Sequence, residues 1–224
     1  MMDEPVKRLN RLDACALSDA LDKLGLAGAV GGLAPRSVPR RIAGRVLTCR
    51  LAAKDVVAAG VPAKPPRHLG TTAIESAHAG DIIVVEQRSG IEAAGWGGIL
   101  SLGAKLAGVA GVICEGPVRD MDEARSYDFP VYARAATTRT ARGRIVEAAN
   151  QEPVLVGEVT VRAGDYAIAD ANGAVFIAAA DISRVLDAAE AIAGREAVMA
   201  KALLAGKLIS QVMDANYEYM LGKP

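Results

Sequence analysis

Apolar positions along the chain follow two different periods. In residues 12–24, "LDACALSDALDKL", apolar side chains recur at spacings of three and four and Gly25 follows, which predicts an amphipathic helix with a glycine stop. Residues 25–41 are rich in glycine and proline and predict a loop. The same two periods then predict helices over residues 67–80 (closed by Gly80), 99–108 and 120–127, and strands over residues 42–52, 81–87, 109–114 and 129–135.

The second half has a different pattern. Residues 153–179 contain several short β-branched runs, with turns expected at Ala163-Gly164-Asp165 and Asn172-Gly173. Asp181 is expected to cap a long alanine-rich helix, with breaks near Gly194 and Gly206.

Helices between single strands, followed by a strand-rich half, indicate an α/β domain whose sheets wrap into a sandwich or barrel. A doubly wound nucleotide-binding sheet is not expected. No glycine-rich fingerprint follows the first strand, and no GxxxxGK[ST] phosphate loop occurs.

Composition narrows the class of protein. With 224 residues and 51% of them hydrophobic, the chain can form one domain over residues 1–224, with residues 180–224 as a C-terminal helical arm between subunits. Lys+Arg and Asp+Glu both number 26, so no overall field favours nucleic acid or a membrane as partner. The charged N-terminus and the lack of a long apolar run lead us to expect a cytoplasmic protein.

Three widely spaced cysteines in apolar surroundings predict reduced core thiols: Cys15, Cys49 and Cys114.

The segment "GWGGILSLGAKLAG" is a candidate anion site. Gly95, Gly97 and Gly98 precede a predicted helix, so free backbone N–H groups at its N-terminus can hold a carboxylate or phosphate. The alternative is a tight loop in which Trp96 is only a packing anchor.

The segment "GVICEGPVRDMDEARSYDFPV" is a second candidate. After a buried strand and an expected Gly-Pro turn, Arg119 and Asp120 stand side by side. A guanidinium can grip a carboxylate or carbonyl oxygen, and an aspartate can bind a hard divalent cation. The alternatives are a surface ion pair or a helix N-cap at Asp120.

Three stretches together resemble the RraA-like family: "GDIIVVE", residues 95–144 and "GEVTVRAGDYAIADANGAVFI". This family includes class II 4-hydroxy-4-methyl-2-oxoglutarate / 4-carboxy-4-hydroxy-2-oxoadipate aldolases and the regulator of ribonuclease activity A. The resemblance covers nearly the whole chain. It implies a swivelling β/β/α-type fold, with a sandwich or barrel core flanked by helices. It also implies homotrimers or homohexamers with sites at subunit interfaces, and a divalent metal, Mg²⁺ or Mn²⁺.

The resemblance also implies roles for individual residues. Arg119 matches the catalytic arginine that grips the pyruvyl part of a 2-oxo acid, and Asp120 matches the metal-binding aspartate. The substrate-carboxylate loop matches Gly97, Gly98, Ile99 and Leu100. The implied reaction is metal-dependent lyase chemistry through a pyruvate enolate, as retro-aldol cleavage of 4-hydroxy-2-oxo diacids or as oxaloacetate decarboxylation.

One position departs from the family pattern. The aldolases carry an acidic residue twenty-one positions before the arginine, where this chain has Gly98. Glu92, Glu115 or Glu196 from a neighbouring subunit are the candidates to compensate. The alternatives are a non-catalytic binding protein like the ribonuclease regulator, or a lyase or hydratase acting on another hydroxy acid.

Other polar residues are weaker candidates. His68 can reach a pocket rim, whereas His78, ten residues later, cannot share its helical face and is expected at the surface. Lys105 fits a solvated helix face rather than a Schiff base. A cluster of arginines can meet a distal carboxylate or form a solvated or intersubunit face: Arg139, Arg142 and Arg144.

Overall fold

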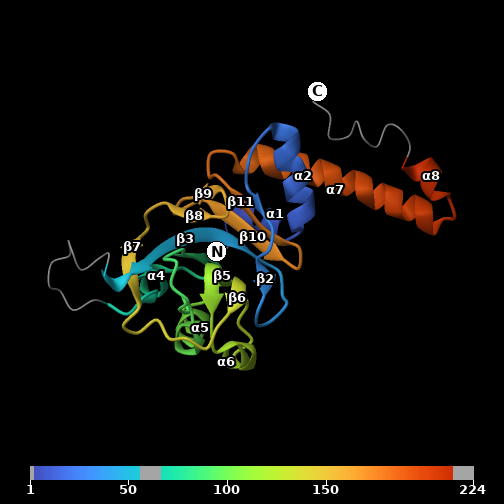
Figure 1. Cartoon of the computed structure of the whole chain (residues 1–224). Coiled ribbons are helices and arrows are strands. Elements are labelled where there is room, and N and C mark those ends of the chain that lie inside the picture. The colour runs from blue at the N-terminus through green and yellow to red at the C-terminus, as the bar shows by residue number, and fades with distance from the viewer. Residues whose placement is uncertain (1–2, 56–66, 214–224) are drawn as a thin grey trace.

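The computed structural model describes residues 3–55 and 67–213, and Figure 1 shows how their elements are arranged. A nine-stranded mixed sheet has the order β1-β11-β10-β3-β4-β5-β6-β2, with β7 paired to β3, and β8 and β9 form a separate hairpin. The helices are α1 Glu4–Leu9, α2 Ala14–Leu24, α4 Thr71–Ser76, α5 Gly98–Leu106, α6 Met121–Ser126, α7 Ile182–Leu204 and α8 Ile209–Val212. The strands are β1 Ala29–Val30, β2 Ala34–Pro35, β3 Ile42–Ala53, β4 Ile82–Gln87, β5 Gly111–Val118, β6 Val131–Ala136, β7 Ile145–Asn150, β8 Val154–Val156, β9 Val159–Val161, β10 Tyr166–Asp170 and β11 Gly173–Ile177.

Strands β3 to β6 run parallel, and the two central ones, β4 and β5, are buried on both faces. Because side chains alternate along a strand, Ile83 and Val85 pack toward α4, α5 and α6, whereas Ile82 and Val84 face the other side. That other side packs against β8, β9, β10 and β11, which completes the sandwich. Each fully buried branched side chain contributes about 1.5–3 kcal/mol. The predicted α/β fold with a sandwich core and flanking helices is therefore confirmed.

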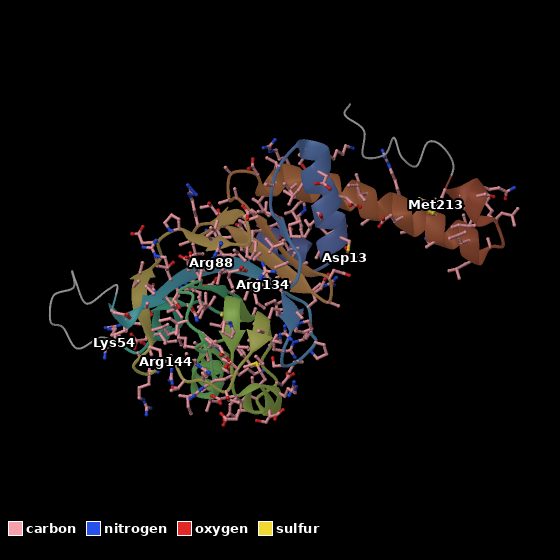
Figure 2. All side chains as sticks on the ribbon, viewed as in Figure 1. Asp13, Lys54, Arg88, Arg134, Arg144 and Met213 are labelled. Atoms are coloured by element: carbon pink, nitrogen blue, oxygen red, sulfur yellow. The ribbon has the colours of Figure 1, made fainter. Side chains whose placement is uncertain are left out.

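A second helical layer, α1, α2 and α7, covers β10 and β11. In Figure 1 these helices lie on the opposite side of the molecule from α4, α5 and α6. The α7 helix runs beyond the body, and Figure 2 places Met213 at the far end of this extension. None of the helices in residues 3–55 and 67–213 combines the length and the apolarity that spanning a bilayer requires.

Several local predictions are confirmed. The α2 helix begins after Asp13, whose Oδ1 accepts a hydrogen bond from the Ala16 amide at 2.8 Å, and it ends at Gly25 with φ +66°. The β9–β10 and β10–β11 connections lie at the two predicted turns. A chain reversal also follows α7 at Gly206, whose φ is +89°.

Other predictions were wrong for identifiable reasons. The helix expected over 67–80 ends at Ser76 because Ala77 is extended, and Gly80 lies in the turn before β4. The Gly-Pro turn expected after Cys114 is instead part of β5, which continues to Val118 through a register irregularity that accommodates Pro117.

Three further expectations need correction. The α7 helix passes through Gly194 unbroken, because alanine and other good helix formers surround this glycine, whose own cost is only about 1 kcal/mol. Asp181 occupies the N-cap position, but its carboxylate binds Arg184 rather than a backbone amide. Cys15 is exposed, because it lies one position away from the buried face of α2, while Cys49 and Cys114 are buried as predicted. The elements α1, β1, β2 and β7 were not predicted.

Candidate functional site

A cavity of about 380 Å³ opens beside the N-terminus of α5, on the side of the sheet that α4, α5 and α6 cover. Its size is in the range of small-molecule sites. It is lined by His68, Leu69, Thr71, Ala94, Trp96, Gly97, Gly98, Ile99, Leu100, Arg119, Asp120, Thr140, Ala141 and Arg142. The structure thus brings the two candidate segments, which are about 20 residues apart, to one place.

Arg119 is held by the end of strand β5. Its backbone N–H donates to the Trp96 carbonyl at 3.1 Å, which ties β5 to the loop before α5. The Arg119 Nε lies 3.2 Å from Asp120 Oδ2, and the two side chains are 38% and 34% exposed. No acceptor in the described part of the chain engages the terminal Nη atoms of Arg119. These atoms are therefore available to an anionic ligand.

Asp120 adopts the left-handed conformation, with φ +59° and ψ +39°. A residue other than glycine pays of order 1 kcal/mol for this backbone, so surrounding contacts must enforce it. The Asp120 carboxylate makes no capping bond to α6. Its Oδ2 instead accepts a hydrogen bond from the Gly98 amide at 3.2 Å. Of the two alternatives for this residue, the ion pair with Arg119 is present and the side-chain N-cap is absent.

The N-terminus of α5 forms the opposite wall. The amides of Ile99 and Leu100 are in the first helical turn, where N–H groups have no acceptor within the helix, while the Gly98 amide is already used by Asp120. Trp96 is buried, and its Nε1 donates to Ser101 Oγ at 3.0 Å. Trp96 is therefore both a packing anchor and a wall of the cavity.

Some of the weaker candidates lie at the cavity and others do not. His68 and Arg142 line it. Arg139 pairs with Glu92 at 3.2 Å, and Arg144 donates to the Thr140 carbonyl. His78 is exposed and lies near Asp81, at the surface as expected.

The proposed compensating carboxylates lie elsewhere in this chain. Glu115 pairs with Arg134 at 2.9 Å, Glu92 is held by Arg139 and Thr137, and neither lines the cavity. Glu196 is exposed on α7, in the helical layer across the sheet. A carboxylate that the sequence reasoning did not single out, Glu123, is exposed and does not line the cavity, but its Oε2 lies against Gly98, which does. A Cβ placed on Gly98 would be 1.9 Å from its Oε2. Its spacing of three residues from Asp120, on one helix face, was the available signal.

No lysine or cysteine is among the residues that line the cavity. Lys105 lies on the outer face of α5, where its Nζ donates to the Asp128 carbonyl at 3.1 Å. Burial raises the pKa of the Cys49 and Cys114 thiols far above the usual range, so both stay protonated. Neither cysteine is among the lining residues.

A second cavity, of about 400 Å³, lies around Asp3, Arg45, His78 and Asp81. Its charged groups pair with one another, Asp3 with Arg45 at 3.3 Å and Asp81 with His78 at 3.7 Å. The cavity beside α5 is therefore the better candidate, because it has charged groups left for a ligand. In residues 3–55 and 67–213, no three His, Cys, Asp or Glu side chains are placed to hold a metal ion.

Comparison with known proteins agrees with this arrangement. The RraA-like family model, described as Aldolase/RraA, matches residues 14–176. The chain belongs to the RraA-like family. The match includes Arg119, Asp120 and the N-terminus of α5, and all the residues that line the cavity lie within the matched region.

Individual members of the family are distant in sequence. Protein DlpA of Legionella pneumophila is 24% identical over 213 residues, covering 95% of this chain and 34% of its own length. A Halalkalibacterium halodurans protein, named as a candidate 4-hydroxy-4-methyl-2-oxoglutarate aldolase, is 26% identical over 83% of this chain and 81% of its own length. The chain thus spans about a third of the length of DlpA.

A solved structure has the same fold. Streptomyces coelicolor RraAS2, described as an unusual member of the RNase ES inhibitor RraA protein family, superposes with a TM-score of 0.74 at 23% identity. The match covers 88% of this chain and 96% of RraAS2.

Proposed function

We propose that this protein is a divalent-metal-dependent lyase that acts on 2-oxo acids through a pyruvate enolate. The reactions are retro-aldol cleavage of 4-hydroxy-2-oxo diacids and decarboxylation of oxaloacetate. One observation carries the proposal: the Arg119 guanidinium, the Asp120 carboxylate and the first-turn amides of α5 meet in a single cavity. Family members named as aldolases support the class of reaction.

Each group has a distinct task in this proposal. The amides of Ile99 and Leu100 hold the carboxylate of the 2-oxo acid at the positive end of the α5 dipole. The Arg119 Nη atoms face the oxygen on which negative charge grows as the carbon–carbon bond breaks. Buried Trp96, Leu69 and Leu100 keep water from the opposite side.

Both reactions share one electron flow. In retro-aldol cleavage the C3–C4 bond breaks, its electron pair forms the enolate, and the 4-hydroxyl loses its proton. In decarboxylation the bond between C3 and the departing carboxylate breaks and leaves the same enolate. Protonation at C3 then gives pyruvate in both cases. A site that stabilises the enolate can therefore serve both reactions.

The residues present fit a magnesium or manganese ion. Asp120 is fixed by Gly98 and Arg119, and a Cβ on Gly97 would lie 3.0 Å from Asp120 Oδ2, so glycine there leaves this carboxylate oxygen uncrowded. Mg²⁺ typically uses one or two protein carboxylates together with waters and substrate oxygens, which suits a site without a three-ligand cluster. A bound ion would supply Lewis acidity to the substrate's oxygens.

The test is pyruvate release from oxaloacetate with Mg²⁺ or Mn²⁺, after subtraction of the rate with metal alone. Arg119→Ala should lower kcat by about 10²–10³-fold, as expected for removal of a donor aimed at developing charge. Arg139→Ala is the matched control, because Arg139 pairs with Glu92 outside the cavity. Equal losses in both variants would contradict the assigned role of Arg119.

A regulatory binding protein is the second candidate. The absence of an acid at position 98 and the fold shared with RraAS2, whose family is described by RNase ES inhibition, favour it. A wild-type protein with no metal-dependent turnover of any 2-oxo diacid would support this candidate over the lyase.

We also propose a homotrimer or homohexamer in which the extension of α7 packs on a neighbouring subunit. Beyond the part of α7 that covers the sheet, apolar side chains are exposed at Val198, Leu204 and Leu208, by 64–89%. Exposed apolar side chains of this size, two near the end of α7 and one just before α8, are typical of a surface that is covered on assembly.

A further inference from the structure

The position that lacks the expected acid is not an empty space. A Cβ built on Gly98 would lie 1.9 Å from Glu123 Oε2 and 3.1 Å from Asp120 Cβ. The Glu123 carboxylate therefore occupies the place where a side chain at position 98 would begin. It enters that place from α6, whereas a side chain of residue 98 would enter from α5.

The backbone does not require glycine at this point, but the end of the Glu123 side chain fills the space beside it. Gly98 is the first residue of α5 and has no left-handed φ, so its backbone accepts any L-residue. A real Cβ never approaches an oxygen to 1.9 Å, so Glu123 and a side chain at position 98 exclude each other in this conformation. A side chain at position 98 would therefore need the Glu123 carboxylate to rotate away from this place.

Two carboxylates meet at Gly98 as a result. Asp120 approaches through its hydrogen bond with the Gly98 amide, and Glu123 approaches from one helical turn further along. No cation or hydrogen-bond donor in residues 3–55 and 67–213 pairs with the Glu123 carboxylate. Asp120 already has the Arg119 guanidinium at 3.2 Å, so Glu123 is the acid of the two that is left without a positive partner.

We propose that Glu123 is the second carboxylate of the cation site and takes the part that an acidic side chain at position 98 would otherwise have. This inference rests on the proposed function, because it assumes a divalent ion held by Asp120. Glu123 then acts as an acceptor for the ion or its water shell, where such partners typically account for 10–100-fold in metal affinity.

A simpler structural role makes a different prediction. Acids are favoured in the first turn of any helix by the helix dipole, and α6 carries two there, Asp122 and Glu123. Asp122 points away and pairs with Arg125 while its side chain is 99% exposed. Asp122→Asn is therefore the matched control, since it removes the same charge from the same turn without touching the cavity.

The first measurement is direct binding of Mn²⁺ to the full chain, by calorimetry and by the loss of the free Mn²⁺ electron paramagnetic signal. Glu123→Gln should weaken Mn²⁺ binding by about 10–100-fold. Asp122→Asn should change it less than about twofold, because Asp122 pairs with Arg125 and, unlike Glu123, does not lie against Gly98. Equal affinities for Glu123→Gln and wild type would overturn the inference. The proposed function would still stand in that case if Asp120→Asn abolished Mn²⁺ binding, because Asp120 would then hold the ion without Glu123.

The second measurement moves the carboxylate back to position 98. Glu123→Ala should lose Mn²⁺ affinity, and Gly98→Asp/Glu123→Ala should recover at least part of it. The Asp120 Cβ must yield a few tenths of an ångström in the double variant, so its thermal unfolding is recorded alongside. A folded double variant with no more affinity than Glu123→Ala would contradict the exchange of roles. A wild-type protein that binds no Mn²⁺ would overturn both this inference and the metal-dependent function.

Discussion

The Oδ2 atom of Asp120 accepts a hydrogen bond from the backbone amide of Gly98, at 3.2 Å and across 22 residues of sequence. This contact joins the turn after β5 to the first residue of α5. It explains how a left-handed aspartate is held with its carboxylate facing the cavity rather than its own helix.

Asp120→Asn should leave the stability of the fold unchanged while it removes the catalytic activity. Asparagine has nearly the same shape, tolerates the left-handed region and keeps an oxygen for the Gly98 amide. We expect a melting temperature close to wild type and a loss of metal-dependent pyruvate release of at least about 10²-fold. Circular dichroism measures the melting temperature, and the oxaloacetate assay measures the metal-dependent release of pyruvate. Parallel loss of stability and turnover would count against the proposed metal role.

Trp96 should report ligand binding. It is the only tryptophan in the sequence, it is buried, and it lines the cavity. Pyruvate or oxalate added with Mn²⁺ should therefore change its fluorescence in a saturable way. Arg119→Ala should weaken the response by about tenfold or more, because a charge-assisted hydrogen bond is lost. A signal unaffected by that substitution would place the ligand elsewhere.

The three thiols should react differently with a maleimide. Cys15 is exposed, whereas Cys49 and Cys114 are buried. Mass spectrometry should show one modified cysteine in the native protein and three after unfolding. Partial burial and the nearby Asp13 carboxylate raise the pKa of Cys15. Because the thiolate is the reactive form, its rate should keep increasing at higher pH than that of a free thiol.

The contact between α1 and α7 should make stability depend on pH. The Arg8 guanidinium hydrogen-bonds Glu190 at 2.8 and 2.7 Å, and this contact lowers the pKa of Glu190. A lowered carboxyl pKa adds stability above the unfolded-state pKa, and that stability is lost as pH falls through the folded-state pKa. The groups are partly exposed, so Glu190→Gln should cost up to about 1 kcal/mol at neutral pH. Thermal melts should show this difference vanishing in strong acid.

A charge introduced on the exposed end of α7 should change the oligomeric state. Leu204 is 89% exposed near the end of α7. If it packs on another subunit, Leu204→Glu buries an unpaired charge there and should shift the protein toward smaller species in light scattering. The circular dichroism spectrum should keep its helical signal. Lys201→Glu, one turn earlier at an exposed polar position, is the control. Unchanged assembly in Leu204→Glu would show that the arm does not hold the oligomer together.

The helices and strands whose limits depend on nearby residues could be predicted from the sequence. The β-branched runs of β4 and β5 are buried on both faces, and the α2 helix has both its cap and its glycine stop, so their residues alone define them. The α1 helix was missed because it has only six residues and is held by Arg8 contacts to α7 that no local pattern reveals.

The site was only partly predictable. Arg119, Asp120 and the start of α5 stand out by residue type and by family resemblance, and the structure brings them into one cavity. Glu123 did not stand out, because an acid in the first turn of a helix is ordinary. Only the 1.9 Å approach to position 98, across two elements, distinguishes it from Asp122.

The register irregularity in β5 constrains chain length more than residue identity. Cys114 pairs with Ala133 and Pro117 with Ala135, so three steps along β5 match two along β6. Deleting one residue there would equalise the steps of the two strands and straighten β5, which would remove the local bend that precedes Arg119. Insertions and deletions between Cys114 and Arg119 should therefore be tolerated far less than conservative exchanges at the same positions.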